Sequence, residues 1–172
     1  GKGILELTDI ISSPYPGASV VPSICRATFD RRTLVGEDEA LILGQVEEAI
    51  EKARKKVPDL KARVFLAEGK EQCWTGETIE AKRYFPAWLI DEKDELVQKA
   101  LAGLKEAGID APISHFSFCT NGSHFCGEAG IPCIGFGPSL ESLAHVRDEY
   151  IEVEQLKKAC RGFYGILSQL TK

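Results

Sequence analysis

Two short apolar runs in the last third of the sequence each end in a polar segment that contains glycine. The first run covers 116–119 and breaks into the turn at 120–123, and the second covers 131–136 and breaks into a Gly-Pro loop. Continuous apolar runs of this length are typical of strands buried on both faces of a parallel sheet. Because such sheets place ligand sites outside the carboxyl ends of their strands, the pattern predicts an α/β fold with a site at these turns.

The remaining periodicities predict two domains. For the first we predict strands at 3–12, 20–31 and 62–67 with an amphipathic helix at 37–57, a small antiparallel α+β unit. For the second we predict helices at 94–107, 123–129 and 153–170 and strands at 115–119 and 132–136, a largely parallel sheet. The predicted domains are 1–70 and 93–172, joined by an irregular crossover at 71–92. The last helix is expected to bury Leu156, Cys160, Phe163, Leu167 and Leu170.

Composition narrows the function classes. A net charge of −5 over 172 residues argues against a nucleic-acid surface, which needs a basic patch. No apolar run approaches the ~20 residues that span a bilayer. The six cysteines are expected to be free thiols in a cytoplasmic setting, with Cys119, Cys133 and Cys160 buried. The absence of methionine suggests a piece of a longer protein.

A histidine in the second loop is the first candidate site residue. His145 follows a buried strand and a Gly-Pro turn, and the carboxylates of Asp148 and Glu149 come directly after it. Neutral imidazole is a good zinc ligand, and a carboxylate can orient it or bind the metal itself. The alternative is a solvated loop histidine, which is the commoner case for a lone histidine.

The polar turn Thr120-Asn121-Gly122 is the second candidate. Its backbone N–H groups lie where a helix begins, so they suit a carboxylate or a developing oxyanion. The alternative is an ordinary Asn-Gly turn followed by Ser123 as a helix cap.

Charged and sulfur-containing residues supply two further candidates. Asp30-Arg31-Arg32 ends a predicted strand, where a guanidinium suits a substrate carboxylate, or where the charges form only a surface ion pair. A structural zinc site is the other possibility, although its spacing lacks a CxxC motif. Its ligands would be Cys119, His124, Cys126 and Cys133.

Taken together, these segments resemble the C-terminal half of the di-zinc peptidase and deacylase family that includes acetylornithine deacetylase and succinyl-diaminopimelate desuccinylase. The resemblance is closest to the bacterial branch of selenium-metabolism-linked hydrolases. It covers nearly the whole chain. The segments that carry it are Asp30-Arg31-Arg32 with Gly36-Glu37, Tyr84 to Trp88, Thr120 to Gly122, and the string Gly130 to Pro138 followed by Ala144-His145 and Glu149.

The resemblance implies an α/β zinc-binding catalytic domain, from about residue 85 onward, and part of a smaller lid domain that often dimerises, up to about residue 70. It implies that His145 is the last zinc ligand, that Arg32 binds a substrate carboxylate, and that Thr120, Asn121 and Gly122 line the substrate pocket. The expected cofactor is zinc, two ions in the complete enzyme, with cobalt or manganese as alternatives. The expected substrate is small or dipeptide-like and bears a carboxylate.

The family's other site residues lie upstream of this half: a His-x-Asp motif, a bridging Asp, a Glu-Glu pair whose first member is the general base, and one more carboxylate. This sequence contains three histidines, His115, His124 and His145, and no His-x-Asp. A catalytic zinc site uses about three protein ligands. The expectation is therefore the C-terminal portion of an amidohydrolase, inactive alone, with no catalytic residue of its own. The alternative is a non-catalytic module that dimerises or binds a small acid.

Overall fold

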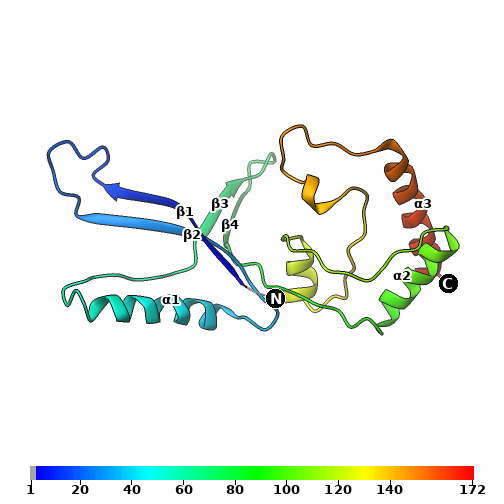
Figure 1. Cartoon of the computed structure of the whole chain (residues 1–172), viewed down its shortest axis with the longest axis horizontal. Coiled ribbons are helices and arrows are strands. Elements are labelled where there is room, and N and C mark those ends of the chain that lie inside the picture. Colours follow the sequence, from blue (N-terminus) through cyan, green and yellow to red (C-terminus); the bar gives the residue numbers. More distant parts are fainter. Residues whose placement is uncertain (1–2) are drawn as a thin grey trace. The chain divides into compact units, whose positions relative to one another are not determined.

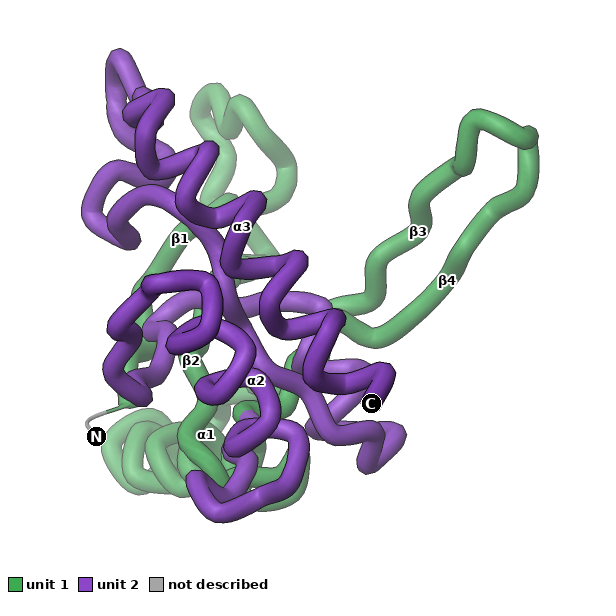
Figure 2. The backbone as a smooth tube through the Cα atoms, turned by 90° about the vertical axis from the view of Figure 1, so that its right-hand side faces the viewer, with its two compact units in different colours: residues 1–87 green, residues 88–172 purple. Residues whose placement is uncertain are grey.

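The computed structural model describes residues 3–172 and divides into two compact units, residues up to 87 and residues 88–172 (Figure 2). The first unit contains two strand pairs and a helix, and the second contains helices joined by irregular segments, so the described residues are a mixture of helix and strand and the predicted mixed α/β class is confirmed. No helix within 3–172 has the length and apolar character needed to cross a membrane.

The first unit begins with an antiparallel hairpin of β1 (Ile4–Ser13) and β2 (Ile24–Arg32). The register pairs Ile4 with Arg32, and it shifts at a bulge between Leu7 and Asp9. These are the two strands predicted for this region. A two-stranded sheet has two unpaired edges, and both faces of this one carry exposed apolar side chains, Leu7, Ile10 and Phe29 among them.

Helix α1 (Glu39–Arg54) follows this hairpin in the chain (Figure 1). The Asp38 carboxylate caps it by accepting the Leu41 N–H at 2.8 Å, which fixes the start two residues after the predicted one. At the other end, the Arg54 guanidinium pairs with Glu47 and Glu51 and donates to the Ala62 carbonyl at 2.6 Å. Arg54 therefore ties the returning chain to the last turn of the helix.

A second hairpin, β3 (Glu68–Gln72) with β4 (Thr78–Lys82), forms where the sequence predicted irregular structure. β3 has no apolar side chain and β4 has two, Ile79 and Ala81, so the apolar pattern is too weak to reveal this hairpin. The ion pairs Lys70–Glu80 and Arg83–Glu71 link its two sides. Gly76, at φ +90°, supplies the left-handed residue of the turn. The strand predicted at 62–67 is wrong, because that segment forms no strand among residues 3–172, although the Ala67 carbonyl accepts the Arg83 N–H at 2.7 Å just beyond the second hairpin.

In the second unit, α2 (Glu95–Glu106) packs against α3 (Val153–Leu170). Asp94 caps α2 by accepting the Leu96 N–H at 2.8 Å. The helices approach so closely that a Cβ atom on Gly103 would overlap the carbonyl of Gly165 and lie 2.7 Å from the Ile166 nitrogen. The core beneath this contact consists of Ala100, Leu104, Ile109 and Ile166.

The predicted buried face of α3 is wrong except at Leu170, which packs against the core. The buried residues are Ala159, Gly162, Gly165 and Ile166. Leu156, Phe163 and Leu167 are 54%, 46% and 60% exposed, and Cys160 is also exposed. The contact with α2 selects small side chains because the helix backbones nearly touch. Apolar periodicity alone marked the larger residues instead.

The segments 115–119 and 132–136 form no strand within residues 3–172, and 115–119 contains a bend at 117–118, so both predicted strands and the predicted parallel sheet are corrected. A parallel strand needs neighbouring strands to pair with its backbone, and the described residues supply no such strand to these segments. Their apolar side chains still pack together: the Phe116 and Phe118 rings stack at 4.7 Å, and Gly135 lies directly against Phe116. The expected burial of Cys119 is wrong, since it is exposed, and Cys133 is half-buried.

Candidate functional site

His145 lies in the loop that connects the Gly137-Pro138 turn to α3. Its backbone adopts the left-handed conformation, with φ +59°. Its N–H donates to the Glu149 carboxylate at 3.0 Å, while its side chain is exposed and forms no hydrogen bond within residues 3–172. A left-handed non-glycine residue is uncommon and costs free energy, and such residues cluster at functional sites. The geometry thus combines a constrained backbone with an imidazole open to a ligand.

Side chains anchor the loop that carries His145 at two further points. Gln155, on α3, accepts the Ser139 N–H at 2.9 Å, and Ser139 is also left-handed at φ +79°. Glu141 accepts both the N–H of Ser117, at 3.0 Å, and the Ser117 hydroxyl. Because Ser117 leads directly into the 120–122 turn, Glu141 links the two predicted site segments of the second unit. The sequence analysis expected adjacent strand ends here, and the structure connects the two segments through this carboxylate.

The Thr120-Asn121-Gly122 turn satisfies much of its own backbone. Thr120 Oγ1 accepts the Gly122 N–H at 3.1 Å, and the Thr120 carbonyl accepts the Ser123 N–H at 3.0 Å. These two donors are therefore occupied within the turn. The amides of Thr120 and Asn121 donate to no acceptor among residues 3–172, and the Asn121 side chain is exposed. The donors that a substrate carboxylate would meet are consequently at the start of the turn.

Packing against Trp88 explains the glycine in this turn. A Cβ atom on Gly122 would lie 2.5 Å from the Trp88 ring, so no larger residue fits without moving the ring or the turn. Ser123, the next residue, is buried and opens a short helix (Ser123–Glu128) of π type. Nothing in the sequence indicates the contact between Gly122 and Trp88, because contacts between distant segments leave no local signal.

The third candidate, Arg32, belongs to the first unit. It ends β2, and its guanidinium pairs with Asp30 at 3.2 Å. The neighbouring residue Arg31 lies on the opposite face of the strand, and its guanidinium binds Glu37 at 2.6 Å. The Arg32 side chain is 49% exposed, whereas the Arg31 side chain is 17% exposed. Arg31 is therefore built into the unit, whereas Arg32 keeps a guanidinium accessible to solvent and to ligands.

Glu37 is the centre of the buried polar contacts around Arg31. Its carboxylate accepts the Leu34 N–H at 2.8 Å, and its carbonyl accepts the Tyr84 hydroxyl at 2.9 Å. The Leu34 bond, followed by the bond and charge of Arg31, holds the pKa of Glu37 below its ordinary value against the opposing effect of burial. Within the described part of the chain, Arg31 Nε is buried without a hydrogen-bond partner.

The residues described do not assemble a complete metal site. No three His, Cys, Asp or Glu side chains within 3–172 lie close enough to hold an ion together. His145 fits the role of one ligand, because its imidazole is exposed and unbonded, and any further ligands would have to come from elsewhere. His124 instead pairs with Glu128 at 2.8 Å, and burial together with nearby Cys126 raises the pKa of the Cys133 thiol. A raised thiol pKa disfavours the thiolate that binds zinc.

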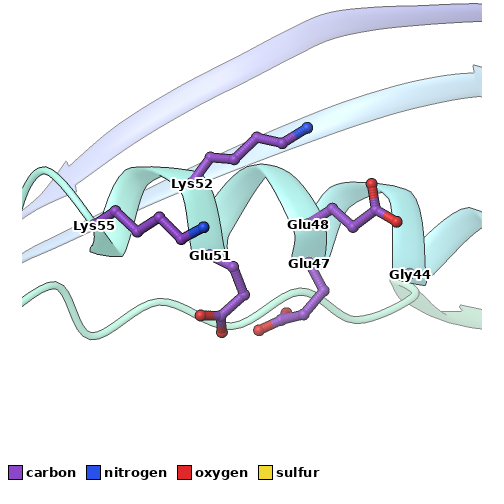
Figure 3. Close-up of a pocket in the computed structure, with 6 residues that line it drawn as sticks. All are labelled: Gly44, Glu47, Glu48, Glu51, Lys52 and Lys55. Atoms are coloured by element: carbon purple, nitrogen blue, oxygen red, sulfur yellow. The ribbon is translucent and has the colours of Figure 1, made fainter.

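A shallow, open depression of about 470 Å³ lies on α1 (Figure 3). None of the predicted site residues lines it. Glutamates are followed along the helix by lysines, and Glu48 and Glu51 each lie four residues before a lysine, an arrangement typical of a solvated face. The lining residues are Gly44, Glu47, Glu48, Glu51, Lys52 and Lys55.

Comparison with known proteins identifies the family. The family model of peptidase family M20/M25/M40 matches residues 8–169. The chain is 32% identical over 151 residues to the uncharacterized protein YgeY of Escherichia coli K12 and equally to that of Escherichia coli O157:H7. The alignment covers 87% of this chain and 36% of the length of these curated relatives. No solved structure matches significantly. The chain belongs to peptidase family M20/M25/M40.

Proposed function

We propose that this chain supplies the C-terminal portion of a metal-dependent amidohydrolase, in the selenium-metabolism-linked branch of the family. In this proposal the complete enzyme cleaves the amide bond of a small or dipeptide-like substrate that bears a carboxylate. The family match over residues 8–169 supports a hydrolase of this kind. The observation that carries the assignment of a site is the exposed imidazole of His145 on a left-handed, anchored loop.

In this proposal His145 is a metal ligand, and the preferred ion is zinc, with cobalt or manganese as alternatives. When bound, zinc would lower the pKa of a coordinated water and polarise the substrate carbonyl. The chain's own contribution is to hold one imidazole in place. The general base and the other ligands lie outside this chain, so the 172 residues alone are expected to have no amidase activity.

Substrate binding is assigned to two places. The Arg32 guanidinium is accessible at the end of β2 and suits a carboxylate, which it can bind through two hydrogen bonds. In the second unit, the Thr120 and Asn121 amides and the exposed Asn121 side chain supply neutral donors at a turn that Gly122 holds against Trp88. Each of these subsites, the charged one in the first unit and the neutral one in the second, suits a polar group of an acyl amino acid or a dipeptide.

The first unit is proposed to form a homodimer. The support is the β1–β2 hairpin, which has unpaired edges and exposed apolar side chains. The six unpaired cysteines are in keeping with a reducing, cytoplasmic setting. A non-catalytic dimerisation or small-acid-binding module remains the alternative function. It predicts a dimer and acid binding without metal.

Metal analysis of the natural full-length polypeptide tests the proposal. His145→Ala should lower bound zinc and reduce amidase activity by several orders of magnitude while leaving the unfolding midpoint unchanged, because an exposed side chain adds little packing. His115→Ala is the matched control, since His115 is also exposed and lies on an extended segment of the same unit. Equal zinc content and rates in the two variants would contradict the role of His145.

A further inference from the structure

We propose that Glu149 is a positioning residue for His145: its carboxylate holds the left-handed backbone that aims the imidazole. The inference rests on the proposed function of His145 as a metal ligand. It assigns Glu149 neither a bond to the imidazole nor a bond to the metal. The contact that carries it is the 3.0 Å hydrogen bond from the His145 N–H to Glu149 Oε2.

The backbone around His145 requires such support. His145 and Asp148 have φ values of +59° and +58°, so two non-glycine residues of one short turn are left-handed. Conformations of this kind cost of order 1–3 kcal/mol each and persist only where surrounding contacts stabilise them. The His145 side chain is exposed and contributes little packing. The hydrogen bond to Glu149 is therefore the contact within residues 3–172 that selects this conformation.

A second left-handed residue of this loop is stabilised by the same type of hydrogen bond. Ser139 is left-handed, and its N–H is bound by a side-chain oxygen from further along the chain, that of Gln155. Ser139 and His145 thus share both the unusual backbone and the type of contact that stabilises it. Two independent instances make a chance contact at Glu149 a poor explanation.

The nearest basic side chain does not compete with the His145 N–H for the Glu149 carboxylate. Arg147, the nearest cation in the sequence, pairs with Asp148 at 3.8 Å, and both side chains are almost fully exposed. Because the φ and ψ of a residue determine the direction of its Cα–Cβ bond, from which the imidazole projects, loss of the Glu149 bond should disperse the imidazole over more positions. Residues that orient a metal ligand typically change metal affinity by ~10–100-fold when mutated.

The first measurement is hydrogen–deuterium exchange of the 143–149 peptide in the natural full-length polypeptide, freed of metal. Glu149→Ala should add about one rapidly exchanging amide, that of His145. Glu149→Gln keeps an oxygen acceptor in the same place and should exchange like the wild type. Glu154→Ala is the control, because Glu154 is an exposed carboxylate that pairs only with Lys157.

The second measurement is zinc affinity of the same variants by competition with a chelating dye. Glu149→Ala should weaken zinc binding by ~10–100-fold, and Glu149→Gln should restore it to within about threefold of the wild type. If Glu149→Gln is as weak as Glu149→Ala, the carboxylate acts through its charge or as a ligand, and the positioning role is overturned. If Glu149→Ala changes neither exchange nor affinity, the role is overturned as well.

The two proposals fail in different ways. If His145→Ala leaves zinc affinity unchanged, the metal-ligand assignment fails, while the exchange of the His145 amide still decides whether Glu149 holds the turn. If His145→Ala abolishes zinc binding and Glu149→Ala leaves it intact, the ligand assignment stands and the positioning role is overturned.

Discussion

Gly103 on α2 and Gly165 on α3 face each other at the point where the two helices nearly touch. A Cβ atom on either glycine would overlap the carbonyl of the other. No other pair of glycines within residues 88–172 shows this reciprocal contact. It determines the spacing of the helices above the Leu104 and Ile166 core.

Gly103→Ala should destabilise the protein. Alanine is better than glycine in a helix by up to ~1 kcal/mol, but the overlap forces the helices apart, and overpacking typically costs ~1–3 kcal/mol. Gly44→Ala on α1 is the matched control, because a Cβ atom there meets nothing within 4 Å, and it should be neutral or stabilising. Urea unfolding of both variants gives the comparison. A more stable Gly103→Ala would contradict the observed helix spacing.

Gly122→Ala should move the Trp88 ring or the 120–122 turn, because the new methyl group would lie 2.5 Å from the ring. The expected loss of stability is ~1–3 kcal/mol. The emission of Trp88 should change, and it can be isolated in a Trp74→Phe background because Trp74 is 97% exposed. Gly137→Ala is the control, since a Cβ atom there meets nothing within 4 Å. Unchanged Trp88 emission in Gly122→Ala would rule out this packing.

Glu37 should make the stability of the first unit depend on pH. Its pKa is lowered in the folded state, chiefly by the Leu34 N–H and then by Arg31, from an ordinary value of 4.5. The stabilisation is therefore fully present above pH 4.5 and is lost as pH falls through the lower folded pKa. Glu37→Gln should flatten this part of the stability curve between neutral and acidic pH. Identical acid sensitivity in both proteins would exclude Glu37 as its source.

Arg32→Ala should affect activity, whereas Arg31→Ala should affect stability. In the natural full-length polypeptide, Arg32→Ala should lower kcat/KM by ~10–150-fold, the loss of a charged hydrogen bond of ~1.5–3 kcal/mol, with stability unchanged because the side chain is exposed. Arg31→Ala should chiefly destabilise the fold, since it leaves Glu37 without its ion pair. Steady-state kinetics and thermal unfolding separate the two. If Arg32→Ala leaves the kinetics unchanged, Arg32 does not bind the substrate.

Thiol labelling should follow exposure in the structure. Cys25, Cys119 and Cys160 are exposed and should react first with iodoacetamide, whereas Cys133 should react slowly because burial and nearby Cys126 raise its pKa. Mass spectrometry of peptides from the native protein measures each rate. Faster labelling of Cys133 than of Cys119 would contradict this order.

Local signals in the sequence predicted the elements that depend on local contacts. The Asp94 cap, the β1 and β2 strands and the α1 and α3 helices follow from capping residues and apolar periods. Elements that depend on partners distant in the sequence could not be predicted this way. The β3–β4 hairpin is stabilised by charge pairs such as Lys70–Glu80, and the segments 115–119 and 132–136 read as strands because periodicity cannot show whether a backbone partner exists.

Local sequence signals likewise predicted one part of the candidate site but not the rest. The positions of His145 and of the 120–122 turn followed from apolar runs that end in polar loops. The anchoring of that loop did not, because Glu141 and Gln155 act on the backbone of residues 24 and 16 positions away, and no motif records such a bond. The sequence likewise placed Glu149 beside His145 as a ligand or an orienting carboxylate, and only the structure shows that it binds the backbone N–H.

The side chains on one face of α3 are small and those on the other are large, and this difference limits which sequence changes the helix tolerates. One face carries the small buried residues Ala159, Gly162 and Gly165, of which Gly165 meets Gly103 of α2, and the other carries Leu156, Phe163 and Leu167. Inserting or deleting a single residue early in the helix would rotate everything after it by about 100°. Bulky side chains would then turn toward Gly103, where there is no space for a methyl group. Related sequences should therefore exchange residues freely on the outer face of α3 but keep the number of residues between Ala159 and Gly165 fixed.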